Sequence, residues 1–245
     1  MLDPTEPLTD DERNELLELY EDLRVTDVSD GLDFFGYGYE LNRMNPDISP
    51  LYRDMDAFSH RFVGFANTVR FLPTNRRREL PEELGFETVV EWRNEWYGNR
   101  SGGPENVRDG DVIVVEAHDI PVGIIGSMNS LTWAADGAVG VVTNGGPRDT
   151  GEMIKQDVPI YAKTINKTII PGRCEFDDTG IPVNVGGCLV RPDDLIVGDG
   201  DGVIVVPQEI THEVGQAAQR EQSADQDARH EYYEKLGLEP DFTLE

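Results

Sequence analysis

The alternation of apolar and polar positions along the chain predicts its regular elements. Arg61 to Leu72 alternates with the two-residue period of a β-strand, and the short continuous apolar runs further on are typical of buried strands. These runs lie at 111–115, 140–143 and 159–163. Helices are predicted between them at 126–135 and 152–156. Three more short strands are predicted at 181–191, 194–198 and 202–206. Strand–helix–strand units followed by hairpins indicate a mixed α/β domain.

Helices are expected at both ends of the chain. Thr9 and the acids after it supply a cap and an acidic first turn for a helix over about 10–23. A second helix begins within 25–32 and ends near Gly36, and a long polar helix is expected over 208–236. The chain is interpreted as one domain, 1–245, with an N-terminal helix (1–24), an elaboration of the core (73–106, helical around 82–97) and a C-terminal helix and tail (208–245).

The chain is strongly acidic. It contains 48 Asp and Glu residues against 21 Lys and Arg residues, which gives a net charge of −27. Such a chain lacks the basic surface that binding to a nucleic-acid backbone requires. The composition is typical of a surface for high salt, where the Debye length shortens to about 3 Å at 1 M. A specific cationic partner is the alternative.

No segment of the sequence indicates secretion or insertion into a membrane. The apolar runs fall far short of the roughly 20 residues that cross a bilayer, and the first residues have neither the basic nor the apolar region of a signal peptide. We therefore expect a cytoplasmic protein. Cys174 and Cys188 have no second pair beside them, which argues against a zinc site and favours free, partly buried thiols.

The main candidate for chemistry follows the predicted strand at 140–143. Glycines end the strand, Arg148 and Asp149 form the turn, and Glu152 comes one helical turn later. The carboxyl end of a strand is where α/β sheets present groups to ligands. A carboxylate there can hold a hard divalent cation, and a guanidinium can neutralise a carboxylate or an enolate. The alternative is a structural Arg–Asp ion pair that caps the helix.

Two other segments carry weaker signals. Gly126 and Ser127 begin a predicted helix whose free N–H groups can bind an anion, although Ser127 is also an ordinary N-cap residue. The alternating Gly and Asp residues at 198–202 lack the terminal Glu of a calcium loop, so they are interpreted as a tight hairpin turn. No Gly-x-Ser-x-Gly sequence of a serine hydrolase is present, and the four histidines lack metal-ligand spacing.

The stretch 107–207 resembles the RraA-like family, which includes 4-hydroxy-4-methyl-2-oxoglutarate aldolases and the regulator of RNase E. The matching pieces are Arg108–Val115, Gly137–Glu152, Val185–Val197 and Asp201–Pro207, with Val25–Leu32 and Phe62–Ala66 extending the likeness towards the N-terminus. The resemblance implies a swivelling β/β/α fold. It also implies a homo-oligomer, a trimer or a hexamer of two trimers, with sites at the subunit interfaces.

The resemblance also implies roles for individual residues. Arg148, Asp149 and Glu152 match the Arg-Asp-x-x-acid motif of the aldolases. By that likeness Asp149 binds Mg²⁺ or Mn²⁺ together with Glu152, and Arg148 contacts a small 2-oxo acid. An acid from the C-terminal helix of a neighbouring subunit completes the metal site, and Glu221 is the candidate.

The turn before the predicted helix at 126–135 supplies the remaining substrate contacts that the resemblance implies. They come from Gly126, Ser127, Met128 and Asn129, with the amides of Met128 and Asn129 on the substrate carboxylate. The chain departs from the aldolase pattern at Ser127, since the motif has Asp at this position, 21 residues before Arg148. A serine cannot act as that carboxylate.

Two functions follow from these observations. Arg148 and Asp149 favour a divalent-metal-dependent lyase that cleaves a C–C bond of a 2-oxo acid through a pyruvate enolate. The reaction is then retro-aldol cleavage of a 4-hydroxy-2-oxo acid or decarboxylation of an oxaloacetate-like acid. Ser127 favours the alternative, a regulatory protein without catalysis. Because of the negative charge, its partners are expected to be proteins rather than nucleic acid or membrane.

Overall fold

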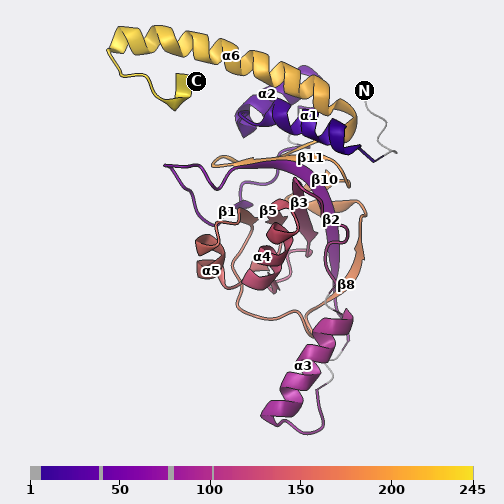
Figure 1. The fold of residues 1–245 in the computed structure, drawn as a ribbon. Coiled ribbons are helices and arrows are strands. Elements are labelled where there is room, and N and C mark those ends of the chain that lie inside the picture. Colours follow the sequence, from indigo (N-terminus) through magenta and orange to yellow (C-terminus); the bar gives the residue numbers. More distant parts are fainter. Residues whose placement is uncertain (1–6, 39–40, 77–79, 101, 245) are drawn as a thin grey trace.

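A curved eight-stranded sheet lies at the centre of the protein (Figure 1). The computed structural model describes residues 7–38, 41–76, 80–100 and 102–244. The strand order is β1-β7-β5-β3-β2-β11-β12, and β8 also pairs with β2. The strands are β1 (Ser49–Pro50), β2 (Phe62–Pro73), β3 (Asp111–Glu116), β5 (Ala138–Thr143), β7 (Ile160–Ala162), β8 (Cys174–Thr179), β11 (Leu195–Asp199) and β12 (Gly202–Val206).

The parallel part of the sheet comprises β2, β3, β5 and β7. β1, β11 and β8 pair antiparallel with their neighbours in this part, and β12 pairs antiparallel with β11. Two small ladders lie outside the large sheet. They are formed by β4 (Gly123–Ile125) with β6 (Gly146–Pro147), and by β9 (Val183–Val185) with β10 (Cys188–Val190).

The helices lie on opposite sides of the sheet (Figure 1). α1 (Asp10–Tyr20), α2 (Val25–Phe34) and α6 (Thr211–Leu236) pack together on one side, and α4 (Ser127–Ala135) and α5 (Thr150–Lys155) lie on the other. α3 (Phe86–Arg100) projects beyond β8 at the far end of the molecule. Short 3-10 turns occur at Gln208–Ile210 and Phe242–Leu244.

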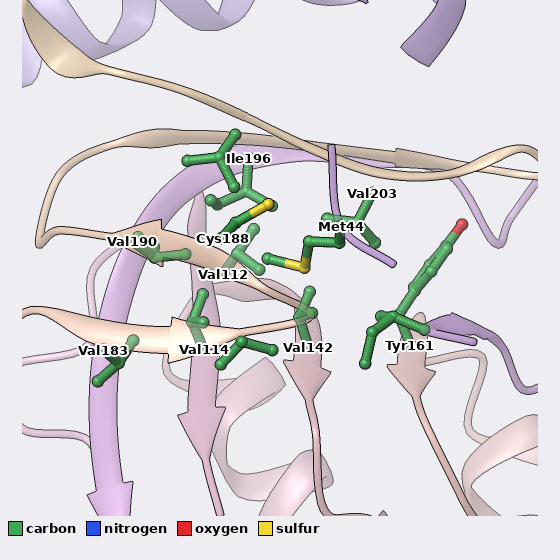
Figure 2. Close-up of a cluster of buried hydrophobic side chains, with 14 of the residues drawn as sticks. Met44, Val112, Val114, Val142, Tyr161, Val183, Cys188, Val190, Ile196 and Val203 are labelled. Atoms are coloured by element: carbon green, nitrogen blue, oxygen red, sulfur yellow. The ribbon is translucent and has the colours of Figure 1, made fainter. Parts of the chain in front are cut away.

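Three apolar cores hold these layers together. One lies between the sheet and the β9–β10 hairpin (Figure 2), one beneath α4, and one between the sheet and α1, α2 and α6. In the first core, Phe62 meets Tyr161 edge to face, with ring centroids 5.2 Å apart. Cys188 belongs to this core and Cys174 to the second, and burial raises the pKa of both thiols to about 12. Both cysteines are free, as predicted, and fully buried.

A buried ion pair attaches α1 to the sheet. Arg13 is almost fully buried, and its guanidinium lies 2.7 Å from the Asp111 carboxylate and 3.3 Å from that of Asp193. The same guanidinium stacks over the Phe65 ring at 4.3 Å. Thr9 and Glu12 form the capping box that begins this helix.

The mixed α/β fold and the terminal helices are confirmed, and so is the hairpin turn at 198–202. Several boundaries differ from the prediction. The N-terminal helix ends at Tyr20, and α3 occupies 86–100 rather than 82–97. The single strand predicted at 181–191 is wrong, because Gly186 and Gly187 adopt φ values of +58° and +81° and turn the chain into the β9–β10 hairpin.

Four of the strands were not expected from the sequence: β1, β4, β6 and β8. None of the helices that the structure describes is both long and apolar enough to cross a membrane.

Candidate active site

The β4–β6 ladder brings the two candidate segments together. In this parallel ladder Gly123 pairs with Gly146 and Ile125 with Pro147. The Arg148 amide then donates to the Ile125 carbonyl at 2.9 Å. The turn that begins α4 and the Arg148–Asp149 turn therefore lie side by side, although they are more than 20 residues apart in the sequence.

Gly126 allows the two turns to approach closely. A Cβ atom at this position would lie 3.2 Å from Oδ2 of Asp149 and 3.5 Å from Nε of Arg148. Arg148 Nε donates to Asp149 Oδ2 at 3.3 Å, and both side chains are about one third exposed. The charged groups of the turn thus lie directly against the backbone that starts α4 and remain open to a ligand.

Asp149 has an unusual backbone conformation. It is the N-cap residue of α5 with φ +60° and ψ +34°, in the left-handed region that non-glycine residues rarely adopt. Its side chain makes no capping hydrogen bond. The carboxylate is therefore not used to cap the helix, which removes the main structural role that an Arg–Asp pair could have here.

Ser127 is connected to Glu152 and does not cap α4. The N-cap residue is Gly126, whose amide donates to Oδ1 of Asn129 at 3.2 Å. Ser127 is buried, and its hydroxyl donates to Oε2 of Glu152 at 2.5 Å. The hydrogen bond joins α4 to α5 across the site. Interpretation of Ser127 as an ordinary N-cap residue was wrong.

The first amides of α4 are available to an anion. In the first turn of a helix the N–H groups have no helical carbonyl to bind. The resemblance implied that the amides of Met128 and Asn129 bind the substrate carboxylate, but the Asn129 amide donates to the Gly126 carbonyl at 3.0 Å. Among the described contacts at the helix start, the amides of Ser127 and Met128 are the ones without a backbone acceptor. The positive end of the helix dipole adds to this anion preference.

A cavity of about 460 Å³ lies against this helix start, where Gly126 and Met128 line it and the buried Ser127 does not. Its wall includes the α4 turn with Met128 and Asn129, the Arg148–Asp149 turn, and apolar residues of β2, β3 and α4. Another part of its wall comes from α3, with Arg93, Asn94 and Tyr97, and the segments 102–104 and 169–170 also line it. A second cavity of about 400 Å³ lies against Arg148 and Asp149 and is lined also by Ile165, Asn166 and Lys167.

The sequence alone gave no signal for the contributions of Arg93, Tyr97 and Lys167. Arg93 and Tyr97 lie in a predicted helix that no motif connects to Arg148, Lys167 lies in a segment without a predicted element, and only the fold brings these residues to cavities that Arg148 also lines. Glu221 is exposed on α6, on the other side of the sheet from α4 and α5 (Figure 1), and it does not line these cavities. Within one chain the candidate metal ligand Glu221 is thus separate from Asp149 and Glu152.

The residues at the turn are compatible with a hard divalent cation, but one chain supplies few carboxylate ligands for it. Asp149 and Glu152 are carboxylates, and Mg²⁺ in proteins is commonly held by one or two carboxylates with water and substrate oxygens. Among the described residues no group of three or more His, Cys, Asp or Glu side chains is close enough to form a complete cage. A cation here would need further oxygen ligands from water, substrate or another subunit.

The fold corresponds to a known class of proteins, the aldolase and RraA proteins. The model of that family matches residues 25–205, so the chain belongs to the RraA-like family. This match includes both turns of the candidate site and the strands that position them.

Curated relatives match parts of the chain. A protein of Halalkalibacterium halodurans, provisionally named a 4-hydroxy-4-methyl-2-oxoglutarate aldolase, is 35% identical over 122 residues, which are 49% of this chain and 57% of that protein. The aldolase of that name from Thermus thermophilus is 27% identical over 168 residues, or 66% of this chain and 91% of the relative. The match thus spans little more than half of the first relative.

A solved structure shows the same fold over nearly the whole chain. RraAS2 of Streptomyces coelicolor, a member of the RNase ES inhibitor RraA family, superposes with a TM-score of 0.69 at 22% identity. The superposition covers 91% of this chain and 98% of that structure. At this identity the likeness concerns the fold alone.

Proposed function

We propose that this protein is a divalent-metal-dependent lyase that cleaves a C–C bond of a small 2-oxo acid through a pyruvate enolate. The observation that carries the proposal is the Arg148–Asp149 turn. It holds an uncapped carboxylate and an accessible guanidinium against the free amides of α4, at the wall of a cavity large enough for a small ligand. The names of the relatives support the same class of reaction.

Each group of the turn has a distinct task in this proposal. The amides of Ser127 and Met128 orient the substrate carboxylate at the start of α4. The Arg148 guanidinium lies near the 2-oxo group and stabilises the negative charge that develops on its oxygen as the C–C bond breaks. In this proposal Ser127 and Glu152, which share a hydrogen bond, hold a water that carries a proton.

Asp149, with Glu152, is the proposed anchor for Mg²⁺ or Mn²⁺. Such a cation, when bound, polarises the 2-oxo group as a Lewis acid. The proposal includes a homo-oligomer, a trimer or hexamer, in which Glu221 of a neighbouring subunit supplies a further oxygen ligand. Mixing inactive Asp149→Asn and Glu221→Gln subunits tests this arrangement, because shared sites regain activity in mixed oligomers and separate sites do not.

The second candidate function is regulatory binding without catalysis. Ser127 supports it, because the aldolase pattern requires a carboxylate where this chain has a hydroxyl bonded to Glu152. Its partner would be a protein, since a net charge of −27 opposes contact with nucleic acid.

A pyruvate-release assay over a panel of 4-hydroxy-2-oxo acids and oxaloacetate, with Mg²⁺, Mn²⁺ or a chelator, distinguishes the two functions. We expect metal-dependent pyruvate release by the wild type and none by Asp149→Asn, because an amide cannot offset the charge of a divalent cation. Asp136→Asn is the matched control, since Asp136 is exposed at the end of α4. Release that survives chelation or the Asp149 change would contradict the proposal, and absence of release from every acid would favour the regulatory function.

A further inference from the structure

α3 lies in the connection between β2 and β3 and forms one wall of the 460 Å³ cavity. Arg93 and Tyr97 are four residues apart, so they share one face of the helix. Both line the cavity, as does Asn94. Arg148 and Asp149 belong to the same lining. The proposed reaction uses only the α4 and Arg148–Asp149 side of this space and gives α3 no task.

The charges of the lining favour an anion with more than one negative group. Among the described residues that line the cavity, the charged side chains are Arg93, Arg148 and Asp149. Two guanidiniums and one carboxylate give a net positive lining in a chain whose overall charge is −27. Clefts with one predominant sign of charge concentrate ligands of the opposite sign.

Arg93 is not used by an ion pair of its own helix. Side chains on a helix pair at spacings of three or four, and for Arg93 these positions hold Val89, Val90, Trp96 and Tyr97. The acids Glu91 and Glu95 are two positions away and face other directions. Within the part of the chain that the structure describes, Arg93 makes no ion pair, a property it shares with Arg53, Arg61, Arg173, Arg191 and Arg220; among these arginines, Arg93 lines this cavity.

The position of α3 is held at its C-terminal end. Trp96 packs against the apolar core beneath α4. Gly102 follows with φ +56° and lies flat against the Phe176 ring, where a Cβ atom would come within 2.0 Å of the ring carbon Cδ2. The Phe176 ring in turn meets Phe71 of β2 at 5.8 Å. Arg93, one helical turn before Tyr97, therefore lies close to the part of α3 that Trp96 holds against the core.

We propose that Arg93 is a specificity-determining residue that binds a second anionic group of the substrate, so that α3 selects dianionic 2-oxo acids over monoanionic ones. The inference rests on the proposed function, because it assumes that the first carboxylate is bound at the start of α4. The lining also suits an aliphatic segment between the two charges, since it includes Phe71, Trp133, Ile169 and Ile170.

Binding of two unreactive acids tests the inference without relying on turnover. 2-Oxoglutarate and 2-oxopentanoate have the same carbon chain, and only the former has a second carboxylate. Isothermal titration of the full-length protein with Mg²⁺ should show 2-oxoglutarate binding at least roughly tenfold more tightly, the effect of one charge-assisted contact. Arg93→Gln should remove most of this preference and leave the affinity for 2-oxopentanoate within about twofold.

Two further variants separate a specific contact from general charge. Arg93→Lys should retain part of the preference, because the lysine keeps the positive charge but not the planar fork. Arg53→Gln removes one exposed arginine outside the cavity lining and should change neither affinity. An unchanged 2-oxopentanoate affinity shows that each variant is folded.

The outcomes distinguish this inference from the proposed function. Equal affinities of the wild type for the two acids, or equal losses for both acids in Arg93→Gln, would overturn the role of Arg93 while pyruvate release could still be observed. If neither acid binds and no 2-oxo acid yields pyruvate, the proposed function fails and the role of Arg93 fails with it.

Discussion

The hydroxyl of Ser127 donates a 2.5 Å hydrogen bond to the carboxylate of Glu152, and this contact joins the starts of α4 and α5. Ser127 occupies the position at which the aldolase pattern has Asp. An aspartate here would face Glu152 at short range. Two carboxylates so close repel each other unless a proton or a cation lies between them. An aspartate in place of Ser127 would therefore need a proton or a bound cation between its carboxylate and that of Glu152.

Ser127→Asp should make the stability of the protein depend on a divalent cation. We expect its melting temperature in a chelator to fall below that of the wild type, because the introduced carboxylate and Glu152 repel each other, and Mg²⁺ to restore most of the loss. Thermal unfolding with and without Mg²⁺ measures this. Ser127→Asn, with no added charge, is the control and should respond to Mg²⁺ as the wild type does. The same melting temperature for Ser127→Asp in chelator and in Mg²⁺ would argue against a cation at Glu152.

Ser127→Asp should also raise pyruvate release from 4-hydroxy-4-methyl-2-oxoglutarate if the wild type is an aldolase with a weakened proton relay. General acid–base groups contribute about 10²–10⁴-fold to rates, so even a partial restoration is measurable. The rate at saturating substrate is the quantity to compare. A rate no higher than that of the wild type would show that the serine is suited to a different substrate or that the chain is not catalytic.

Gly126→Ala tests the close contact between the two turns. Its φ of −111° is allowed for alanine, so the backbone need not change. The new methyl group would lie 3.2 Å from Oδ2 of Asp149 and should displace this carboxylate by a few tenths of an ångström. We expect activity to fall by roughly tenfold or more with little loss of stability, since small misplacements at a reacting centre are costly. Gly151→Ala is the control, because a Cβ atom there meets nothing within 4 Å. Equal activities of the two variants would rule out a role for this contact.

Arg148→Lys tests whether turnover requires the planar guanidinium of Arg148. Lysine keeps the charge but cannot hold a carboxylate and a developing enolate together with one planar group. Turnover should fall by about 10²-fold, a loss typical for one stabilising donor, while the fold stays intact. Steady-state kinetics gives the change, and Arg76→Lys, an exposed arginine paired with Glu175 at 3.6 Å, serves as the control. Retention of wild-type turnover by Arg148→Lys would mean that the guanidinium acts only as a diffuse charge.

The sequence predicted the parts of the fold that have a strong period. β2 and α2 repeat apolar side chains at strand or helix spacing, β3 is a continuous apolar run, and all three were expected close to their observed positions. β4 and β6 have three and two residues, too few to show any period, and their pairing depends on the tertiary structure. β8 is mostly polar and half exposed, so burial leaves no pattern in it either.

Part of the candidate site could likewise be predicted from the sequence, and part depends on the tertiary structure. Arg148, Asp149 and Glu152 form a local motif that could be found by inspection of the sequence, whereas Arg93 lines the cavity only because the tertiary structure places α3 beside it. The triple arginine at 76–78 lies mostly outside the described residues; of the three, Arg76 is described and pairs with Glu175. The contact between Ser127 and Glu152 was also unexpected, since 25 residues separate the two positions.

Arg13→Met should destabilise the protein more than a typical surface change. It would leave Asp111 buried without its cation, although the amide of Arg108 and the side chain of Asn67 still donate to this carboxylate. Removal of one partner from a buried pair costs about 3–5 kcal/mol. The free energy of unfolding in denaturant gives the value, and Arg76→Met is a surface control. A loss below about 1 kcal/mol would show that the remaining hydrogen bonds suffice for Asp111.

The acidic surface should make the fold depend on salt. With 48 acids and 21 bases, the charges repel one another, and this repulsion reaches further as the Debye length grows from about 3 Å at 1 M to about 30 Å at 0.01 M. We expect the melting temperature to fall by several degrees or more between molar and millimolar KCl. Sucrose provides the control, because it stabilises compact states without screening charge. If sucrose at low salt restores stability as fully as KCl, exclusion of solute from the surface explains the effect. A melting temperature that is independent of KCl would show that the excess of carboxylates is tolerated without screening, and the interpretation as a surface for high salt would be wrong.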